Sequence, residues 1–210
     1  MSQVIEALKW RYATKKFNPN KTLSEAKLSV LKEAFDLTAT SFGLQPVRLV
    51  VVSDTKVQQT LVPLSMGQQQ VVDASHLLVF CIEKKVDAAF VEAYFENIKS
   101  IRNTSEEILN PFRDYLLDVF AKESQEDTHR WATKQAYLAM GNLLTICAIE
   151  EIDACPMEGF DPAGYDSVLG LADHGLSSVL VMPIGYRSED DMFADFKKVR
   201  KGTSKSVLEL

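Results

Sequence analysis

The stretch WATKQAYLAMGNLLTICAIEEI, residues 131–152, decides how this chain folds, because it is long and apolar almost all the way round a helix. A helix that is apolar on every side is buried in a large core or in a subunit interface. A chain of 210 residues can hardly bury such a helix with its own residues alone. The stretch therefore predicts a homodimer whose core includes this helix from each subunit.

Polar residues within the same stretch argue against a membrane helix. They are Lys134, Gln135, Asn142, Glu150 and Glu151. A membrane span needs roughly twenty predominantly apolar residues. We therefore expect a soluble protein with no membrane partner.

On both sides of this stretch, apolar residues at helical spacing predict further helices. The expected ranges are residues 2–12, 55–64, 87–102 and 105–121. Ser24 and Asp161 each open one more helix. Serine and aspartate are favoured N-cap residues because their side chains accept a hydrogen bond from a free backbone N–H group of the first turn.

Three short runs rich in β-branched residues predict strands at residues 47–52, 76–82 and 178–184. Pro183 indicates an edge position or a strand end for the third run, since proline cannot donate to a ladder. Few strands among many helices, without regular alternation, indicate an α+β fold. No repeat or linker divides the chain, so residues 1–210 are expected to form a single domain.

The charge of the chain argues against nucleic acid as a partner, because the net charge is −6 and the sequence pI about 5.2. Basic residues do gather late in the chain, at Lys197, Lys198, Arg200, Lys201 and Lys205. Such a run is usually a solvated surface, although small anionic ligands use the same groups.

The cysteines indicate a reducing compartment. Cys81, Cys147 and Cys155 form no CxxC pair and no pattern of paired spacing. The first residues, MSQVIEALKWRYATKKF, contain no uninterrupted apolar segment and no small-residue cleavage site. We therefore expect no secretory signal and a cytoplasmic location.

Several common catalytic and nucleotide-binding motifs are missing from the sequence. His76, His129 and His174 stand alone, with no HExxH and no carboxylate or cysteine at ligand spacing, which predicts no metal site. There is no GxGxxG, Walker A or GxSxG sequence. A Rossmann or P-loop nucleotide site and a serine hydrolase are therefore disfavoured.

Four segments, in order from residue 11 to residue 200, instead resemble one family. RYATKKF at residues 11–17 is similar to an RxSxKxF signature, and SFGLQP at residues 41–46 to a loop that ends in Gln-Pro. PMEGF at residues 156–160 and KVR at residues 198–200 complete the set. Together they resemble the FMN-dependent nitroreductases, and within them the oxygen-insensitive NAD(P)H nitroreductase and dihydropteridine reductase group.

The resemblance implies a fold and an activity. The implied fold is a nitroreductase-like α+β fold, with a central mixed β-sheet surrounded by helices and an interlocked homodimer holding FMN at the subunit interface. The implied activity is an enzyme's ping-pong transfer of hydride from NADH or NADPH through flavin N5. Nitroaromatics, quinones, pteridines and free flavins are the small-molecule acceptors it implies. Such chemistry requires no acid–base side chain, because the cofactor carries it.

The resemblance also implies roles for the cationic residues. Arg11 and Arg200 suit the flavin phosphate, because a guanidinium binds phosphate oxygens bidentately, and Lys198 adds a third charge. Lys15 is implied to be catalytic, near the N1/O2 edge, where a fixed cation stabilises the charge of the reduced ring. Without the resemblance, Arg11 and Lys15 read as ordinary solvated cations at a helix end.

Two backbone segments complete the implied cofactor site. In the segment of Pro156, Glu158 and Gly159, a backbone N–H is implied to donate to flavin N5, which makes Glu158 the second candidate catalytic residue. Gly159 permits the close backbone approach that this contact needs, although a glycine there also suits a simple turn. A second loop is implied to reach the partner subunit's flavin, with Gln45 at the pyrimidine edge of the ring. The other residues of this loop that are implied to contact the flavin are Thr40, Ser41 and Gly43.

The sequence departs from the family pattern at several positions. Ala13 stands where the signature has serine, and Gly67 where the family often has asparagine. Gln70, and also Gln68, could still supply a side-chain contact there. Val47 replaces a tryptophan that often follows Gln-Pro. These changes bear on flavin affinity and substrate preference.

Two other functions remain open on the sequence. One is a flavin-binding carrier or regulatory protein without useful turnover, which Ala13 and Gly67 favour. The other is a thiol enzyme or hydrolase that uses Cys155 as nucleophile. Helices in residues 85–128 are expected to cover the pocket, but their aromatic residues are assigned no role. These are Phe90, Tyr94, Phe112, Tyr115 and Phe120.

Overall fold

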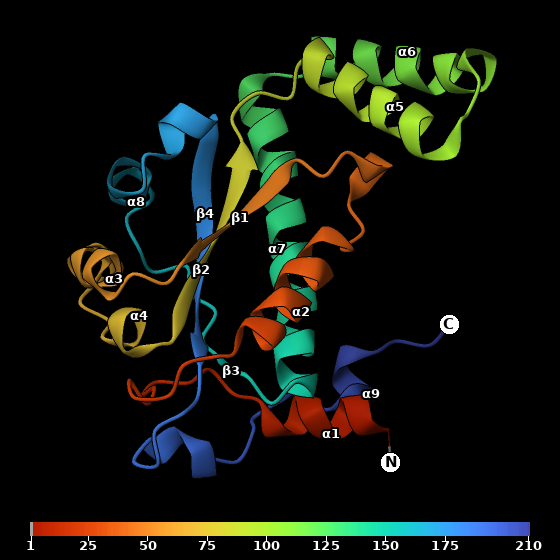
Figure 1. Ribbon diagram of the computed structural model, residues 1–210. Helices are drawn as coiled ribbons and strands as arrows, with labels where there is room; N and C mark the ends of the chain where they lie inside the picture. Colours follow the sequence, from red (N-terminus) through yellow and green to blue (C-terminus); the bar gives the residue numbers. More distant parts are fainter. Residues whose placement is uncertain (1) are drawn as a thin grey trace.

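The computed structural model describes residues 2–210, and its longest element is helix α7 (Gln125–Ile149). This helix crosses the molecule from the pair α5 (Ala88–Arg102) and α6 (Glu106–Lys122) at one end to α1 (Gln3–Trp10) at the other (Figure 1). It begins six residues before the start of the predicted stretch, residues 131–152, and ends three residues before the end of that stretch. Ser124 sets its start, because the Ser124 hydroxyl accepts a hydrogen bond from the N–H of Asp127.

Only one side of α7 is buried within the chain. Its buried side includes Ala132, Ala139 and Leu143. On the other side Tyr137 is 46% exposed and Leu138 52% exposed. Residues 2–210 therefore cover the apolar surface of the helix on one side only.

The sheet is four-stranded, in the order β1-β2-β4-β3. Its strands are β1 (Val47–Val52), β2 (His76–Glu83), β3 (Asp153–Ala154) and β4 (Leu176–Gly185). Every neighbouring pair of these strands is antiparallel, so the sheet differs from the mixed sheet that was expected. Parallel pairing is confined to an isolated bridge between Ala13 and Ala154. The difference arises because β2 and β3, which run in the same direction, lie on either side of β4 and do not pair with each other.

Pro183 lies in β4, which is an inner strand of the sheet, so the edge position expected for it is wrong. The expected strand end is confirmed, because β4 ends two residues later at Gly185. Proline removes one ladder donor, but the Pro183 carbonyl still accepts from the N–H of Cys155 at 3.0 Å.

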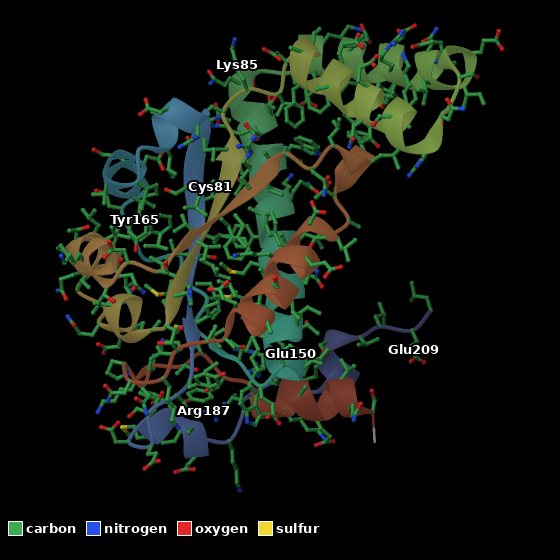
Figure 2. All side chains as sticks on the ribbon, in the orientation of Figure 1. Cys81, Lys85, Glu150, Tyr165, Arg187 and Glu209 are labelled. Atoms are coloured by element: carbon green, nitrogen blue, oxygen red, sulfur yellow. The ribbon has the colours of Figure 1, made fainter. Side chains whose placement is uncertain are left out.

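The two faces of the sheet pack against different helices, as side chains alternate along β2. On one face Leu78 and Phe80 pack with α7 and with α2 (Glu25–Asp36). On the other face Leu77, Val79 and Cys81 form a second core that includes Tyr165 (Figure 2). The helices on that side are α3 (Thr55–Leu61), α4 (Gln70–Asp73) and α8 (Pro162–Val168) (Figure 1).

Local signals in the sequence located most of these elements. The predicted N-caps are confirmed, because Ser24 accepts from the N–H of Lys27 and Asp161 from the N–H of Ala163. The short elements β3, α4 and α9 (Thr203–Ser206) were not predicted. Short 3₁₀ turns complete the chain at Ser41–Gly43, Pro63–Ser65, Leu171–His174 and Met192–Asp195.

Membrane-crossing length and apolarity do not occur together in any helix of residues 2–210.

Candidate functional site

The segment after α1 is held in place by one buried carboxylate, Asp191. The Tyr12 hydroxyl donates to Asp191 Oδ2 at 2.8 Å, and the backbone N–H groups of Lys15 and Lys16 donate to the same oxygen at 2.8 and 3.1 Å. Burial opposes the ionisation of Asp191, but these hydrogen bonds outweigh it and lower its pKa below the usual 3.8. Asp191 thus replaces the backbone partners that this segment lacks outside a helix or strand.

A second acidic residue, Asp153 of β3, anchors the same region from beneath. The buried Asp153 carboxylate accepts from the backbone N–H and the Nε of Arg187, each at 2.7 Å. The Arg187 guanidinium also lies 4.3 Å from the ring centre of Trp10 and 4.6 Å from that of Tyr12. Paired and stacked in this way, Arg187 is a structural cation at the end of the molecule where α7 finishes, near Glu150 (Figure 2).

Cations from both ends of the chain meet above this region. Arg11, Lys15, Lys198 and Arg200 line a hollow of about 360 Å³ together with Ala13. No aspartate or glutamate lines it. Burial, and then the positive charge of Arg200, lowers the pKa of Arg11, and burial followed by Arg11 and Arg200 lowers that of Lys198. Cations that disfavour one another in this way suit a small dianion such as phosphate.

Lys15 and Gln70 converge on Cys155. The Lys15 ammonium and the Gln70 side-chain amide each lie 3.9 Å from the Cys155 sulfur. Burial raises the pKa of the Cys155 thiol, and the groups that touch its sulfur are an ammonium and an amide rather than a histidine. A protonated, buried thiol without a base is a poor nucleophile, so the structure disfavours the thiol-enzyme interpretation.

The segment after β3 presents free backbone donors. The N–H groups of Cys155 and Met157 donate to β4, at the carbonyls of Pro183 and Val181. Pro156 has no N–H group, and those of Glu158 and Gly159 meet no acceptor within residues 2–210. An added Cβ at Gly159 would lie 3.2 Å from the sulfur of Met66. A side chain at position 159 would therefore displace Met66 slightly, and glycine also suits a ligand contact.

The Glu158 side chain is held by helix α7. The Tyr137 hydroxyl donates to Glu158 Oε1 at 2.7 Å, and this bond, with burial adding to it, raises the pKa of Tyr137. Both residues line a further hollow of about 470 Å³ on the exposed side of α7, beside Gly141 and Leu144. The segment of Pro156 and Glu158 thus opens onto the uncovered apolar side of α7.

The loop of Thr40, Ser41, Gly43 and Gln45 contacts α7 near the middle of the helix, away from α1. The Ser41 N–H donates to Gln135 Oε1 at 2.9 Å, whereas α1 packs against Ala148. Residues 135 and 148 are about 20 Å apart along the helix axis. The structure therefore gathers Arg11, Ala13, Lys15, Lys198 and Arg200 in one hollow and links Gln70 to Lys15 through Cys155. Pro156 and Glu158 lie beside Tyr137, near the middle of α7. The loop lies away from the cationic hollow, on the side of the molecule where α5 and α6 also lie (Figure 1).

Gly43 and Gln45 are shaped by their own surroundings in this loop. Gly43 has a φ of +75°, and an added Cβ would lie 2.6 Å from the Tyr94 hydroxyl, so glycine is needed on both grounds. The Gln45 amide donates to the carbonyl of Asp36 at 2.7 Å. Helices α5 and α6, expected to cover the pocket, do not cover the cationic hollow of their own chain.

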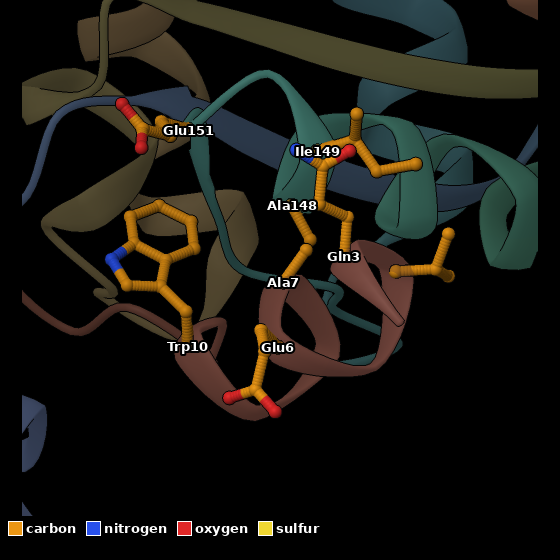
Figure 3. A pocket seen from close by; sticks show the side chains of 8 residues that line it. Gln3, Glu6, Ala7, Trp10, Ala148, Ile149 and Glu151 are labelled. Carbon is orange, nitrogen blue, oxygen red and sulfur yellow. The ribbon is translucent and has the colours of Figure 1, made fainter. Parts of the chain in front are cut away.

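Another hollow, of about 410 Å³, is lined by residues of α1 and of the end of α7 (Figure 3). Trp10, Ala148 and Ile149 line it, with Glu6 and Glu151 at its rim. None of the predicted cofactor-binding residues lines it. It belongs to the uncovered apolar surface at this end of the molecule.

Asp153, Arg187 and Asp191 could not be predicted from the sequence alone. Each acts through a contact with a residue at least 30 positions away, and a single sequence does not display such pairings. Tyr12, which contacts Asp191, did have a signal in the sequence, because it lies inside the segment of residues 11–17.

The fold is that of the nitroreductase class of α+β proteins. A solved structure of a nitroreductase family protein from Streptococcus pneumoniae superposes with a TM-score of 0.81 at 22% identity and covers 98% of each chain. The crystal structure of an Exiguobacterium sibiricum protein in complex with FMN superposes with a TM-score of 0.86 at 16% identity, covering 100% of this chain and 98% of that one.

Sequence comparison establishes the family. The model of the nitroreductase family matches residues 8–186, so this chain belongs to the nitroreductase family. It is 29% identical over 205 residues to the oxygen-insensitive NAD(P)H nitroreductase of Salmonella typhimurium, with 94% of each chain covered. It is 32% identical over 196 residues to a protein of Staphylococcus haemolyticus named as a candidate NAD(P)H nitroreductase, with 89% of each covered. The family inferred from the four motifs is confirmed.

Replacement of Asp191 by asparagine tests the anchoring of residues 12–16. Because the folded-state pKa of Asp191 is lowered, its contribution to stability is present above the unfolded-state pKa and is lost as pH falls through the folded-state pKa. Asp191→Asn should therefore lower the free energy of unfolding by about 1–3 kcal/mol near neutral pH, with the difference from wild type shrinking in acid. Urea unfolding at several pH values measures this; a difference independent of pH would contradict the charged role.

Proposed function

We propose that this chain is an FMN-dependent oxidoreductase that takes hydride from NADH or NADPH and passes two electrons to a small-molecule acceptor. The observation that supports it most is the hollow in which Arg11, Lys198 and Arg200 gather with Lys15, and whose lining includes no aspartate or glutamate among residues 2–210. The named activity of the Salmonella relative and the FMN complex of the Exiguobacterium structure agree with the proposal.

The cations of the hollow bind the flavin phosphate in this proposal. Arg11 and Arg200 supply guanidinium donors, and Lys198, whose ammonium already contacts the Arg11 carbonyl, supplies a point charge. Ala13 lies within the same hollow and contributes no hydroxyl, so the phosphate depends on the cations more heavily than the RxSxKxF pattern implies.

Lys15, Glu158 and Gly159 are the groups that face the reacting ring in the proposal, beside Pro156 and Gln70. FMN, when bound, supplies hydride-level redox chemistry. Lys15 places a positive charge where negative charge develops on reduction. The free N–H groups of Glu158 and Gly159 can donate to a ring nitrogen, and the bonds of Met157 to β4 hold the start of their segment.

A homodimer completes the site. The proposed interface is the exposed side of α7, where Tyr137, Leu138 and Ile149 leave a large apolar surface in water. Such a pairing would bring the loop of Thr40–Gln45 of one subunit toward the cationic hollow of the other. It would also explain why the loop and the cationic hollow lie apart within one chain.

The proposal places the enzyme in the cytoplasm. Cys81, Cys147 and Cys155 are all free and buried, which suits a reducing compartment. Nitroaromatics, quinones, pteridines and free flavins are the proposed acceptors, because a planar ring stacked above a flavin is the shared requirement.

A flavin carrier without useful turnover is the second candidate. Ala13 and Gly67 favour it, because neither supplies the polar side chain of the family pattern, and Gly67 has no atom of another residue within 4 Å of an added Cβ. A carrier would bind FMN but would not exchange hydride with a nicotinamide.

The visible spectrum of the purified protein, followed by NADH in the absence of oxygen, separates these functions. The proposal predicts FMN in the heat-released supernatant and bleaching of the flavin band on addition of NADH or NADPH. Bound FMN that neither nucleotide bleaches would favour the carrier. Failure to bind added FMN would refute both.

Arg200→Ala tests the phosphate hollow. Loss of one charged hydrogen bond worth about 1.5–3 kcal/mol should weaken FMN binding by roughly ten- to hundred-fold. Lys201→Ala is the matched control, because Lys201 is the next residue and an equal charge but does not line the hollow. Titration of the flavin-free protein with FMN, followed by fluorescence quenching, measures both. Equal weakening in the two variants would mean that only the general charge of the tail matters.

A further inference from the structure

The turn of Glu158, Gly159 and Phe160 is shaped by two backbone hydrogen bonds. The Glu158 carbonyl accepts from the N–H of Phe160 at 3.0 Å, and the N–H of Asp161 donates to Leu64 at 2.7 Å. In a trans peptide the N–H points opposite to the C=O. Engagement of the Glu158 carbonyl therefore directs the Gly159 N–H away from the turn, toward the side where it meets no acceptor.

Glycine at the centre of this turn needs an external restraint. Gly159 has no Cβ, so its backbone is free to rotate unless another group holds it. The Gln68 side-chain amide provides such a group, because its Nε2 donates to the Gly159 carbonyl at 3.2 Å. The same nitrogen would lie only 3.5 Å from an added Cβ at Gly159. Gln68 and Gly159 are thus packed against each other as well as hydrogen-bonded.

Gln68 is itself held by the residues that surround Lys15. Gln68 Oε1 accepts from the Gln70 amide at 3.0 Å, and that amide also contacts the Cys155 sulfur. The Lys15 ammonium contacts the same sulfur. A continuous series of polar contacts therefore runs from the Gly159 carbonyl through Gln68, Gln70 and Cys155 to Lys15.

We propose that Gln68 is a positioning residue that orients the Glu158–Gly159 turn and couples it to Lys15 through Gln70. This rests on the proposed function, since the two ends of the series are the groups assigned there to the flavin ring. Gln68 acts through the turn rather than on the cofactor. Both oxygen and nitrogen of its amide are used, so no shorter or apolar side chain replaces it.

Three variants separate this role from simple packing. Gln68→Met keeps the length but neither bonding group, and Gln68→Glu keeps the acceptor for Gln70 while losing the donor to Gly159. Gln69→Met is the matched control, because the exposed Gln69 side chain makes no contact in this series. Flavin reduction by saturating NADH without oxygen, the midpoint potential of bound FMN, and FMN affinity are measured for each.

Both Gln68 variants should reduce the flavin roughly ten- to hundred-fold more slowly, as misplacement of a reacting group does, with KM for NADH nearly unchanged. The potential should shift to more positive values, because an N–H donor to N5 stabilises the oxidised ring. In the flavin-free protein, amide exchange at Phe160 and Asp161 should quicken in Gln68→Met and not in Gln69→Met.

The positioning role would be overturned if Gln68→Met had the same reduction rate, midpoint potential and amide exchange as the wild-type protein. A Gln68→Glu variant that behaves like wild type would overturn it too. Both results leave the proposed function intact, because the wild-type protein still binds FMN and bleaches with NADH. A wild-type protein that takes up no FMN would instead overturn the proposed function and this inference with it.

Discussion

Everything in this structure depends on helix α7 having two apolar sides and only one of them covered by its own chain. The covered side, around Ala139 and Leu143, carries the sheet and α2. The uncovered side, around Tyr137 and Leu138, leaves apolar area in water at a cost of about 25 cal/mol per Å². A partner that covers it removes that cost, so the hydrophobic effect that builds the core also favours assembly.

The same helix separates two sets of polar groups that one chain cannot bring together. At one end, Asp191 and Asp153 hold a segment whose cations would otherwise repel one another. Near the middle of the helix, Gln135 holds the Ser41 loop. Each set is rigid because buried partners orient it, and each is incomplete as a binding site for a long anionic ligand. The proposed dimer would bring the two sets together, with two subunits sharing two sites.

How much the sequence predicts depends on how local the deciding interaction is. β1 has the predicted bounds, because a β-branched run between turn residues carries its own signal, and the Ser24 cap is equally local. The hollow of Arg11 and Arg200 was predicted through motifs whose order, rather than any single residue, is informative. Asp191 and the two-residue strand β3 were missed, because both are defined by distant partners. The antiparallel sheet was missed for the same reason: strand direction is a property of the connections.

The central claim is that each site takes its cations from one subunit and its loop from the other. Heterodimers of Arg200→Ala with Ser41→Glu, isolated through two different tags, test it most directly. The account predicts that, at FMN concentrations that fill only an intact site, each variant alone has little activity. The heterodimer then regains about half of the wild-type activity per dimer, since a two-fold dimer holds one intact site. A heterodimer of Arg200→Ala with Arg11→Ala, both from the hollow, should stay inactive. If the Arg200→Ala/Ser41→Glu heterodimer is as inactive as its parents, the two groups serve the same chain and the account is wrong.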